Sequence, residues 1–127
     1  MQQNLLILIV DDSEFARKTL GIALSGHRYI FAKNGQEAVN IFKEKKPNLV
    51  FLDLGLPDIP GVQVLAEFIK LKADSYVVIV SGNDTKETVI ECISAGAKGY
   101  IVKPFSKFTV EQYIDNYVKS INFDELF

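Results

Sequence analysis

Residues 5–12 read LLILIVDD, six apolar side chains in a row followed by two aspartates. Unbroken apolar runs of this length are typical of central strands that are buried on both faces of a parallel sheet. Leu49–Leu52 and Tyr76–Val80 are further runs of this kind, and Tyr29–Ala32 and Tyr100–Val102 are shorter ones. The pattern therefore predicts three central strands and two flanking strands.

Amphipathic segments long enough for helices follow each of these runs. Their apolar residues recur at helical spacing around residues 15–24, 35–45, 62–69, 85–95 and 110–121. Asn34 with Glu37, and Asp84 with Glu87, have the capping-box pattern that opens a helix, so we expect Asn34 and Asp84 to be N-caps. Strands that alternate with helices in this way predict a doubly wound α/β sandwich built from β-α units.

Length and composition limit what the chain can do. It has 127 residues, so we expect a single domain over residues 1–127, with a core at about 5–121 and a C-terminal tail at 122–127. The 14 basic and 16 acidic residues give a net charge of −2, which argues against direct nucleic-acid binding by bulk electrostatics. One cysteine excludes an internal disulfide framework and a cysteine-based zinc site.

The first apolar run is too short for a signal peptide or a membrane span, and no basic segment precedes it. We therefore expect a cytoplasmic protein that does not insert into a membrane.

Polar residues follow four of the expected strands. Asp11 and Asp12 follow the first strand, Asp53 the third, Ser81 the fourth and Lys103 the fifth. Doubly wound sheets bind ligands at the carboxyl ends of their strands, so we expect these side chains to converge at one edge.

Three carboxylates in one place raise one another's pKa unless a cation lies among them. An all-oxygen cluster is the environment that Mg²⁺ prefers, and Lys103 supplies a further positive charge. An aspartate in such a site can form an acyl phosphate, because phosphoryl transfer requires positioning and charge neutralisation.

Four motifs at these strand ends carry a resemblance to a known family. They are Val10-Asp11-Asp12, the DLGLP segment at 53–57, Ser81-Gly82 and the GYIVKPF segment at 99–105. In this order they resemble the receiver domains of two-component response regulators, over residues 5–121 or nearly the whole chain. The resemblance implies a flavodoxin-like sandwich with a central parallel sheet in the strand order 2-1-3-4-5.

The resemblance also implies a role for each site residue. Asp53 would accept a phosphoryl group from a phosphohistidine on a sensor histidine kinase or a phosphotransfer protein. Asp12 would bind Mg²⁺ (or Mn²⁺) directly, Asp11 mainly through metal-bound water, and Gly55 through its backbone carbonyl. Lys103 would pair with the acceptor and then with the phosphoryl group.

A conformational switch is implied as well. Ser81 would hydrogen-bond a phosphoryl oxygen, and Tyr100 would turn inward as the hydroxyl moves. The Lys103–Pro104 peptide bond would be cis. The face built from the fourth helix, the fifth strand and the fifth helix would then bind a downstream protein.

Two positions depart from the chemotaxis-type pattern of the family. Gly55 has no side chain, and Asn83 is neutral where some relatives carry an acid. Both flank the path of the hydrolytic water in the family, so they leave the lifetime of the phosphate open.

Other functions remain to be weighed against a signalling switch that catalyses only its own phosphorylation and dephosphorylation. A phosphohydrolase of the haloacid dehalogenase type would want a second acid at Gly55, and a flavin-binding electron carrier would be repelled by Asp11 and Asp12. A receiver-like protein-binding module that is never phosphorylated is a third alternative.

The tail 122–127 could fold back on the last helix, seed a dimer or begin a linker, and the oligomeric state stays open.

Overall fold

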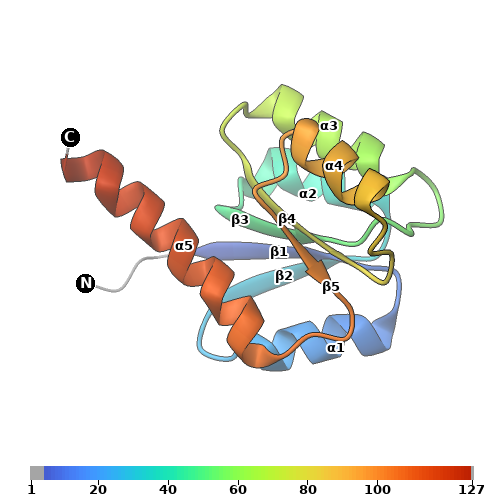
Figure 1. Ribbon diagram of the computed structural model, residues 1–127, viewed down its shortest axis with the longest axis horizontal. Helices are drawn as coiled ribbons and strands as arrows, with labels where there is room; N and C mark the ends of the chain where they lie inside the picture. Colours follow the sequence, from blue (N-terminus) through green and yellow to red (C-terminus); the bar gives the residue numbers. More distant parts are fainter. Residues whose placement is uncertain (1–4, 127) are drawn as a thin grey trace.

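The computed structural model describes residues 5–126, with side chains as far as Ile121. Within these residues a parallel sheet has the strand order β2-β1-β3-β4-β5. The strands are β1 (Leu6–Val10), β2 (Arg28–Ala32), β3 (Leu49–Leu52), β4 (Tyr76–Ser81) and β5 (Gly99–Val102). The helices are α1 (Glu14–Ala23), α2 (Gly35–Lys45), α3 (Gly61–Leu71), α4 (Lys86–Ser94) and α5 (Lys107–Leu126). The predicted sandwich and strand order are therefore confirmed (Figure 1).

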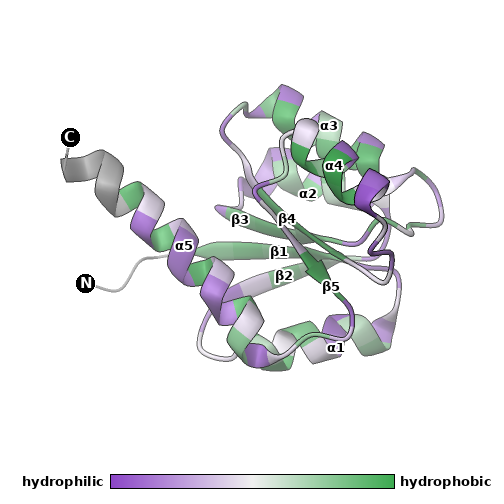
Figure 2. Cartoon of the chain, viewed as in Figure 1, coloured by the Kyte–Doolittle hydropathy of each residue, from purple (hydrophilic) through white to green (hydrophobic). Residues whose placement is uncertain are grey.

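Helices cover both faces of the sheet. In Figure 1, α2, α3 and α4 lie on one side of the strands, and α1 and α5 lie on the other. Successive side chains of β1 alternate between these layers: Leu8 and Val10 belong to the core with α2 and α3, whereas Ile7 and Ile9 belong to the core with α1 and α5. Burial on both faces explains why the central strands β1 and β3 are apolar throughout, as Figure 2 shows.

The predicted helix starts differ in their outcome. Asn34 caps α2 as predicted. The prediction that Asp84 caps α4 is wrong, because Thr85 is the N-cap and its side chain accepts a hydrogen bond from the N–H of Thr88. The physical reason is the turn before the helix. The side chain of Asn83 accepts the N–H of Thr85 at 2.9 Å, which places the helix start one residue later.

Two contacts fasten the part of the β3–α3 loop that leads into α3. The carboxylate of Asp58 accepts the backbone N–H groups of Gly35 at 2.7 Å and Gln36 at 2.9 Å, at the start of α2. At the other end Gly61 packs so closely that an added Cβ would lie 2.5 Å from Cα of Leu54. The chain that leaves β3 therefore has little freedom to move.

The last helix, α5, begins against the sheet and runs past its edge (Figure 1). Val110 and Ile114 are buried in the core that α5 shares with α1. The predicted tail at 122–127 lies outside the residues whose side chains are described, so its role stays open. No helix in the described part of the chain is long and apolar enough to cross a membrane.

Candidate functional site

The end of β1 holds a buried carboxylate. Asp11 is only 1% exposed, and its Oδ1 accepts the N–H of Ser13 at 2.9 Å. Ser13 in turn caps α1 by accepting the N–H of Ala16. The neighbouring Asp12 is exposed to solvent. The two acids that follow β1 therefore differ sharply in their access to water.

The ends of β3 and β5 bring a second acid and a lysine to the same place. Asp53 continues the sheet, because its N–H donates to the carbonyl of Val10 at 2.9 Å, and its side chain is 12% exposed. The N–H of Lys103 donates to the carbonyl of Ser81 at 2.8 Å, and the peptide bond to Pro104 is cis. Backbone hydrogen bonds of the sheet thus fix where both side chains begin.

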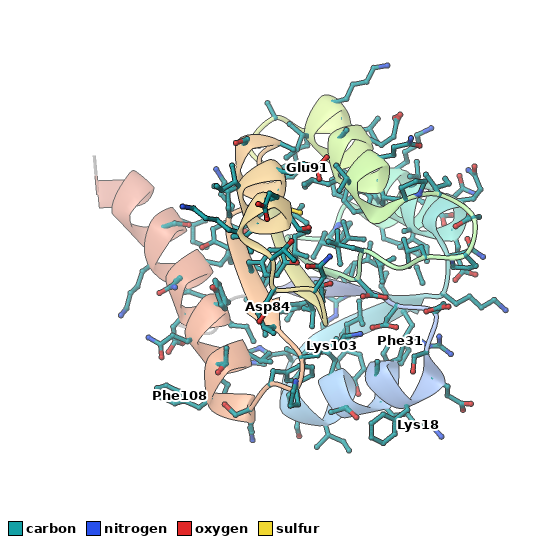
Figure 3. All side chains as sticks on the ribbon, turned by 45° about the vertical axis from the view of Figure 1, so that its right-hand side comes forward. Lys18, Phe31, Asp84, Glu91, Lys103 and Phe108 are labelled. Atoms are coloured by element: carbon teal, nitrogen blue, oxygen red, sulfur yellow. The ribbon has the colours of Figure 1, made fainter. Side chains whose placement is uncertain are left out.

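Lys103, labelled in Figure 3, follows β5 and lies between the buried Asp11 and the half-buried Asp53. Its Nζ lies 3.0 Å from Oδ2 of Asp11 and 3.5 Å from Oδ1 of Asp53. Burial alone would lower the pKa of Lys103, but the hydrogen bond to Asp11 and the charges of both acids outweigh it and raise that pKa. The ammonium group is therefore held in its charged form.

Asp53 is the acid of this group whose ionised form is disfavoured. Burial and, after it, the negative charge of Asp11 raise the pKa of Asp53. Lys103 and the N–H of Gly55 act in the opposite direction but do not compensate fully. The site therefore holds negative charge that the described side chains do not neutralise.

The three carboxylates lie close enough to bind one metal ion together. Asp11, Asp12 and Asp53 each offer an oxygen within 4.8 Å of the others. Hard divalent cations such as Mg²⁺ take carboxylate and carbonyl oxygens of this kind. The donor set and its excess of negative charge both fit such an ion.

Ser81, at the end of β4, is connected to Tyr100 through Asn83. Ser81 is 6% exposed, and its Oγ accepts the N–H of Asn83 at 3.1 Å. The hydroxyl of Tyr100 donates to the carbonyl of Asn83 and also interacts with Ser81. One loop after β4 therefore contacts both a residue of the acidic site and the aromatic ring on β5.

Two residues that hold this site were not predicted. The Nη1 of Arg17 donates to the carbonyl of Asp11 at 2.8 Å. The carboxylate of Asp58 fixes the loop that contains Gly55. Both act on backbone groups, and their sequence positions, one in a helix and one in a loop, carry no signal that separates them from ordinary surface residues.

Comparisons with known proteins give a consistent result. A family model described as the response regulator receiver domain matches residues 7–115. The chemotaxis protein CheY of Thermotoga maritima is 35% identical over 116 residues, which cover 89% of this chain and 97% of that protein.

Solved structures agree with this result. A CheY-like receiver domain protein from Methanospirillum hungatei has a TM-score of 0.87 and 26% identity, over 94% of this chain and 97% of that one. A chain of the CheX–CheY–BeF₃–Mg²⁺ complex from Borrelia burgdorferi has a TM-score of 0.83 and 31% identity, over 87% of this chain and 86% of that one. The resemblance predicted from the four motifs is thus confirmed: the chain belongs to the response regulator receiver domains, the signalling switches of two-component systems.

Proposed function

We propose that Asp53 accepts a phosphoryl group from a phosphohistidine on a sensor histidine kinase or a phosphotransfer protein. The position of Lys103, 3.0 Å from Asp11 and 3.5 Å from Asp53, is the observation that carries the proposal. An oxygen of Asp53 attacks the phosphorus, the P–N bond to the histidine breaks as the new O–P bond forms, and the imidazole leaves with the electron pair. This chemistry needs positioning and charge neutralisation more than covalent help.

The acidic cluster supports a site for Mg²⁺ or Mn²⁺. Asp12 and Asp53 would hold the ion directly, Asp11 mainly through a water molecule, and Gly55 through its carbonyl. Three oxygens within 4.8 Å and the raised pKa of Asp53 support this assignment. The bound ion would neutralise charge on the phosphoryl oxygens during transfer.

After transfer, two side chains would bind the new group. The ammonium of Lys103 lies 3.5 Å from Oδ1 of Asp53. It would therefore need to move only slightly to pair with a phosphoryl oxygen. The hydroxyl of Ser81, which accepts the N–H of Asn83 and interacts with the hydroxyl of Tyr100 in this structure, would turn to donate to another phosphoryl oxygen. A phosphoryl group adds close to two negative charges and three acceptor oxygens, which is enough to reorganise such contacts.

We propose that this reorganisation reaches Tyr100. Movement of Ser81 toward the phosphoryl group would pull on Asn83, whose carbonyl accepts the hydroxyl of Tyr100. The ring and the loop after β4 would then shift together. The bistable element is the face built from α4, β5 and α5.

This face has the chemistry of a protein-binding surface. Ile90 and Ile93 of α4 are 52% and 46% exposed, and Val102 of β5 is 40% exposed. Apolar side chains grouped on a surface are typical of protein interaction sites. We propose that a downstream protein, rather than nucleic acid or a membrane, binds here.

A separate apolar hollow adjoins the reacting groups on the other side. It has a volume of about 300 Å³ and is lined by Phe15, Ala16, Thr19, Lys103, Pro104 and Phe105. Phe15 is 81% exposed at its rim. We propose that the protein bearing the phosphohistidine docks here, because the hollow lies beside Lys103 and leaves the α4 face free.

The lifetime of the phosphate would depend on two neighbours of the acceptor. Gly55 presents no side chain, and the side chain of Asn83 is engaged with the N–H of Thr85. We propose that neither side chain blocks water from the phosphoryl group, so that mainly backbone atoms limit its access. The chain would catalyse only its own phosphorylation and dephosphorylation, and we place it in the cytoplasm, where sensor kinases present their phosphohistidines.

The test is the intact mass of the protein after incubation with Mg²⁺ and acetyl phosphate. Wild type should gain one phosphoryl group that hydroxylamine removes, as expected for an acyl phosphate. Asp53→Asn should gain none. Asp74→Asn is the matched control, because this exposed aspartate pairs with Lys72 just before β4, at the opposite end of the strands from Asp53, and should leave phosphorylation intact.

Each outcome bears on the proposal. A phosphoryl group that persists in Asp53→Asn would show that the acceptor is another residue. No gain in any variant would favour a protein-binding module that works without phosphorylation, and partner capture would then become the informative experiment.

A further inference from the structure

Asp11 has a hydrogen-bond partner at every polar group. Its N–H donates to the carbonyl of Ala32 at 3.0 Å, and its carboxylate binds the N–H of Ser13 and the ammonium of Lys103. Its carbonyl accepts Nη1 of Arg17 at 2.8 Å. The first three contacts belong to the sheet, the helix cap and the ion pair already described, whereas the contact with Arg17 has no part in any of these.

The bond from Arg17 acts on the peptide unit that joins Asp11 to Asp12. A hydrogen bond from a guanidinium is charge-assisted and stronger than one between neutral groups. The planar guanidinium loses little freedom in making it. The carbonyl of Asp11 and the N–H of Asp12 lie in one peptide plane. Holding that carbonyl therefore restricts the direction in which the side chain of Asp12 projects from the backbone.

We propose that Arg17 is a positioning residue for the divalent cation site. The carboxylate of Asp12 is exposed and makes no hydrogen bond or ion pair with the side chains and backbone described for residues 5–121. By holding the peptide plane before it, Arg17 keeps this carboxylate converged with those of Asp11 and Asp53. The inference deepens the proposed function and rests on it. Residues that orient ligands from behind typically change metal affinity by 10- to 100-fold when they are removed, so an effect of about tenfold is expected here.

The sign of the effect separates positioning from simple electrostatics. Removing a positive charge near a cation site should tighten cation binding, since the repulsion between the two charges is lost. Removing a positioning residue should weaken binding, since the carboxylates no longer converge. Arg17→Ala therefore gives opposite results under the two explanations.

The experiment measures the Mg²⁺ dissociation constant by calorimetry, with the metal alone as the probe. Arg17→Ala should raise it by about tenfold. Arg17→Lys, which can still donate one hydrogen bond to the same carbonyl, should restore part of the affinity. Lys18→Ala is the matched control, because Lys18 is the next residue of α1 and pairs with Glu14 in solvent, where both side chains are more than 70% exposed. Its constant should stay within about twofold of wild type.

A second readout needs no metal. The amide of Ser13, bonded to Oδ1 of Asp11, should exchange with deuterium faster in metal-free Arg17→Ala than in Lys18→Ala, at equal global stability. Denaturant unfolding of each variant supplies that comparison.

The outcomes distinguish this inference from the proposed function. If wild type binds no Mg²⁺, both are wrong. If wild type binds Mg²⁺ and Arg17→Ala binds it equally well or more tightly, only the role of Arg17 is wrong. If Arg17→Ala does not fold, Arg17→Gln and Arg17→Lys decide, and equal affinity in these two and in wild type would overturn the inference.

Discussion

The ammonium nitrogen of Lys103 lies 3.0 Å from Oδ2 of Asp11, a carboxylate that is only 1% exposed. This contact joins the ends of β5 and β1, which are not neighbours in the sheet. A buried carboxylate is costly without a partner, and the ion pair with Lys103 offsets part of the cost of burying Asp11.

We expect Lys103→Ala to lower the free energy of unfolding by about 1–3 kcal/mol, because it leaves a buried acceptor without its donor. Urea unfolding in the absence of divalent cations measures the loss. Lys72→Ala is the control, because the Lys72–Asp74 pair has a similar distance, 2.9 Å, but exposed side chains. Its effect should stay below about 1 kcal/mol. Equal losses in the two variants would show that Asp11 does not need Lys103.

Asp53→Asn should stabilise the protein when no divalent cation is present. Burial and the charge of Asp11 raise the pKa of Asp53, so its ionised form costs stability at neutral pH. The amide removes that charge at nearly the same volume, and we expect the melting temperature to rise by a few degrees.

Adding Mg²⁺ should reverse this order, because an ion that binds only the folded wild type stabilises it by mass action. Thermal unfolding with and without Mg²⁺ measures both effects. A variant that is less stable than wild type in the absence of cations would contradict the electrostatic explanation.

Two glycines near Asp53 should respond differently to alanine. In Gly61→Ala the new Cβ would lie 2.5 Å from Cα of Leu54 and 2.9 Å from the carbonyl of Asp53, and backbone cannot yield cheaply. We expect a loss of about 1–3 kcal/mol and slower phosphorylation by acetyl phosphate. In Gly55→Ala the nearest atom is Oδ2 of Asp53 at 3.8 Å, an ordinary contact. Its stability should change by less than about 0.5 kcal/mol. Equal destabilisation of the two variants would mean that the close approach at Gly61 is not what holds the loop.

The sequence predicts the sheet and the convergence at its edge for a clear physical reason. Strands buried on both faces must be apolar throughout, so Leu49–Leu52 is visible as a strand without any tertiary information. Once the strand order is known, the carboxyl ends of parallel strands bring Asp11, Asp53 and Lys103 together.

Residues that act on backbone groups could not be predicted in this way. Arg17 binds a carbonyl and Asp58 binds N–H groups, and every residue offers such partners, so no pattern of side chains reveals the pairing. The N-cap of α4 was predicted one residue early for a related reason. Asp84 and Thr85 are both good N-caps, and the turn that Asn83 closes decides between them.

Asp58 should contribute stability that is lost at low pH. The N–H groups of Gln36 and Gly35 lower the pKa of Asp58 below its usual value of 3.8. A carboxylate whose pKa is lower in the folded state stabilises that state above its unfolded pKa, and the contribution disappears as the pH falls through the lower, folded value. Wild type should therefore be more stable than Asp58→Asn at pH 5 to 7, by a few degrees in melting temperature, and the two should converge below about pH 3.

Asp74→Asn serves as the control for this pH series. Its pKa is also lowered, but by an exposed lysine rather than by a helix start, so salt should screen its contribution. A difference between wild type and Asp58→Asn that disappears in high salt would contradict the assignment to backbone N–H groups.

Tyr100→Phe should uncouple the acceptor from the α4 face. The hydroxyl of Tyr100 donates to the carbonyl of Asn83, whose N–H donates to Ser81. Without that hydroxyl, phosphorylation of Asp53 should still occur, but movement of the loop would no longer be transmitted to the ring on β5. We expect the gain in mass with acetyl phosphate to be unchanged. The changes in the NMR chemical shifts of the α4 amides on phosphorylation should fall to less than about half of those in wild type, because one hydrogen bond worth about 1 kcal/mol is lost. Tyr113→Phe is the control, because its hydroxyl points to the carbonyl of Tyr100 at 3.4 Å and not to the loop. Full α4 shifts in Tyr100→Phe, or equal losses in both variants, would show that the hydroxyl has no part in the switch.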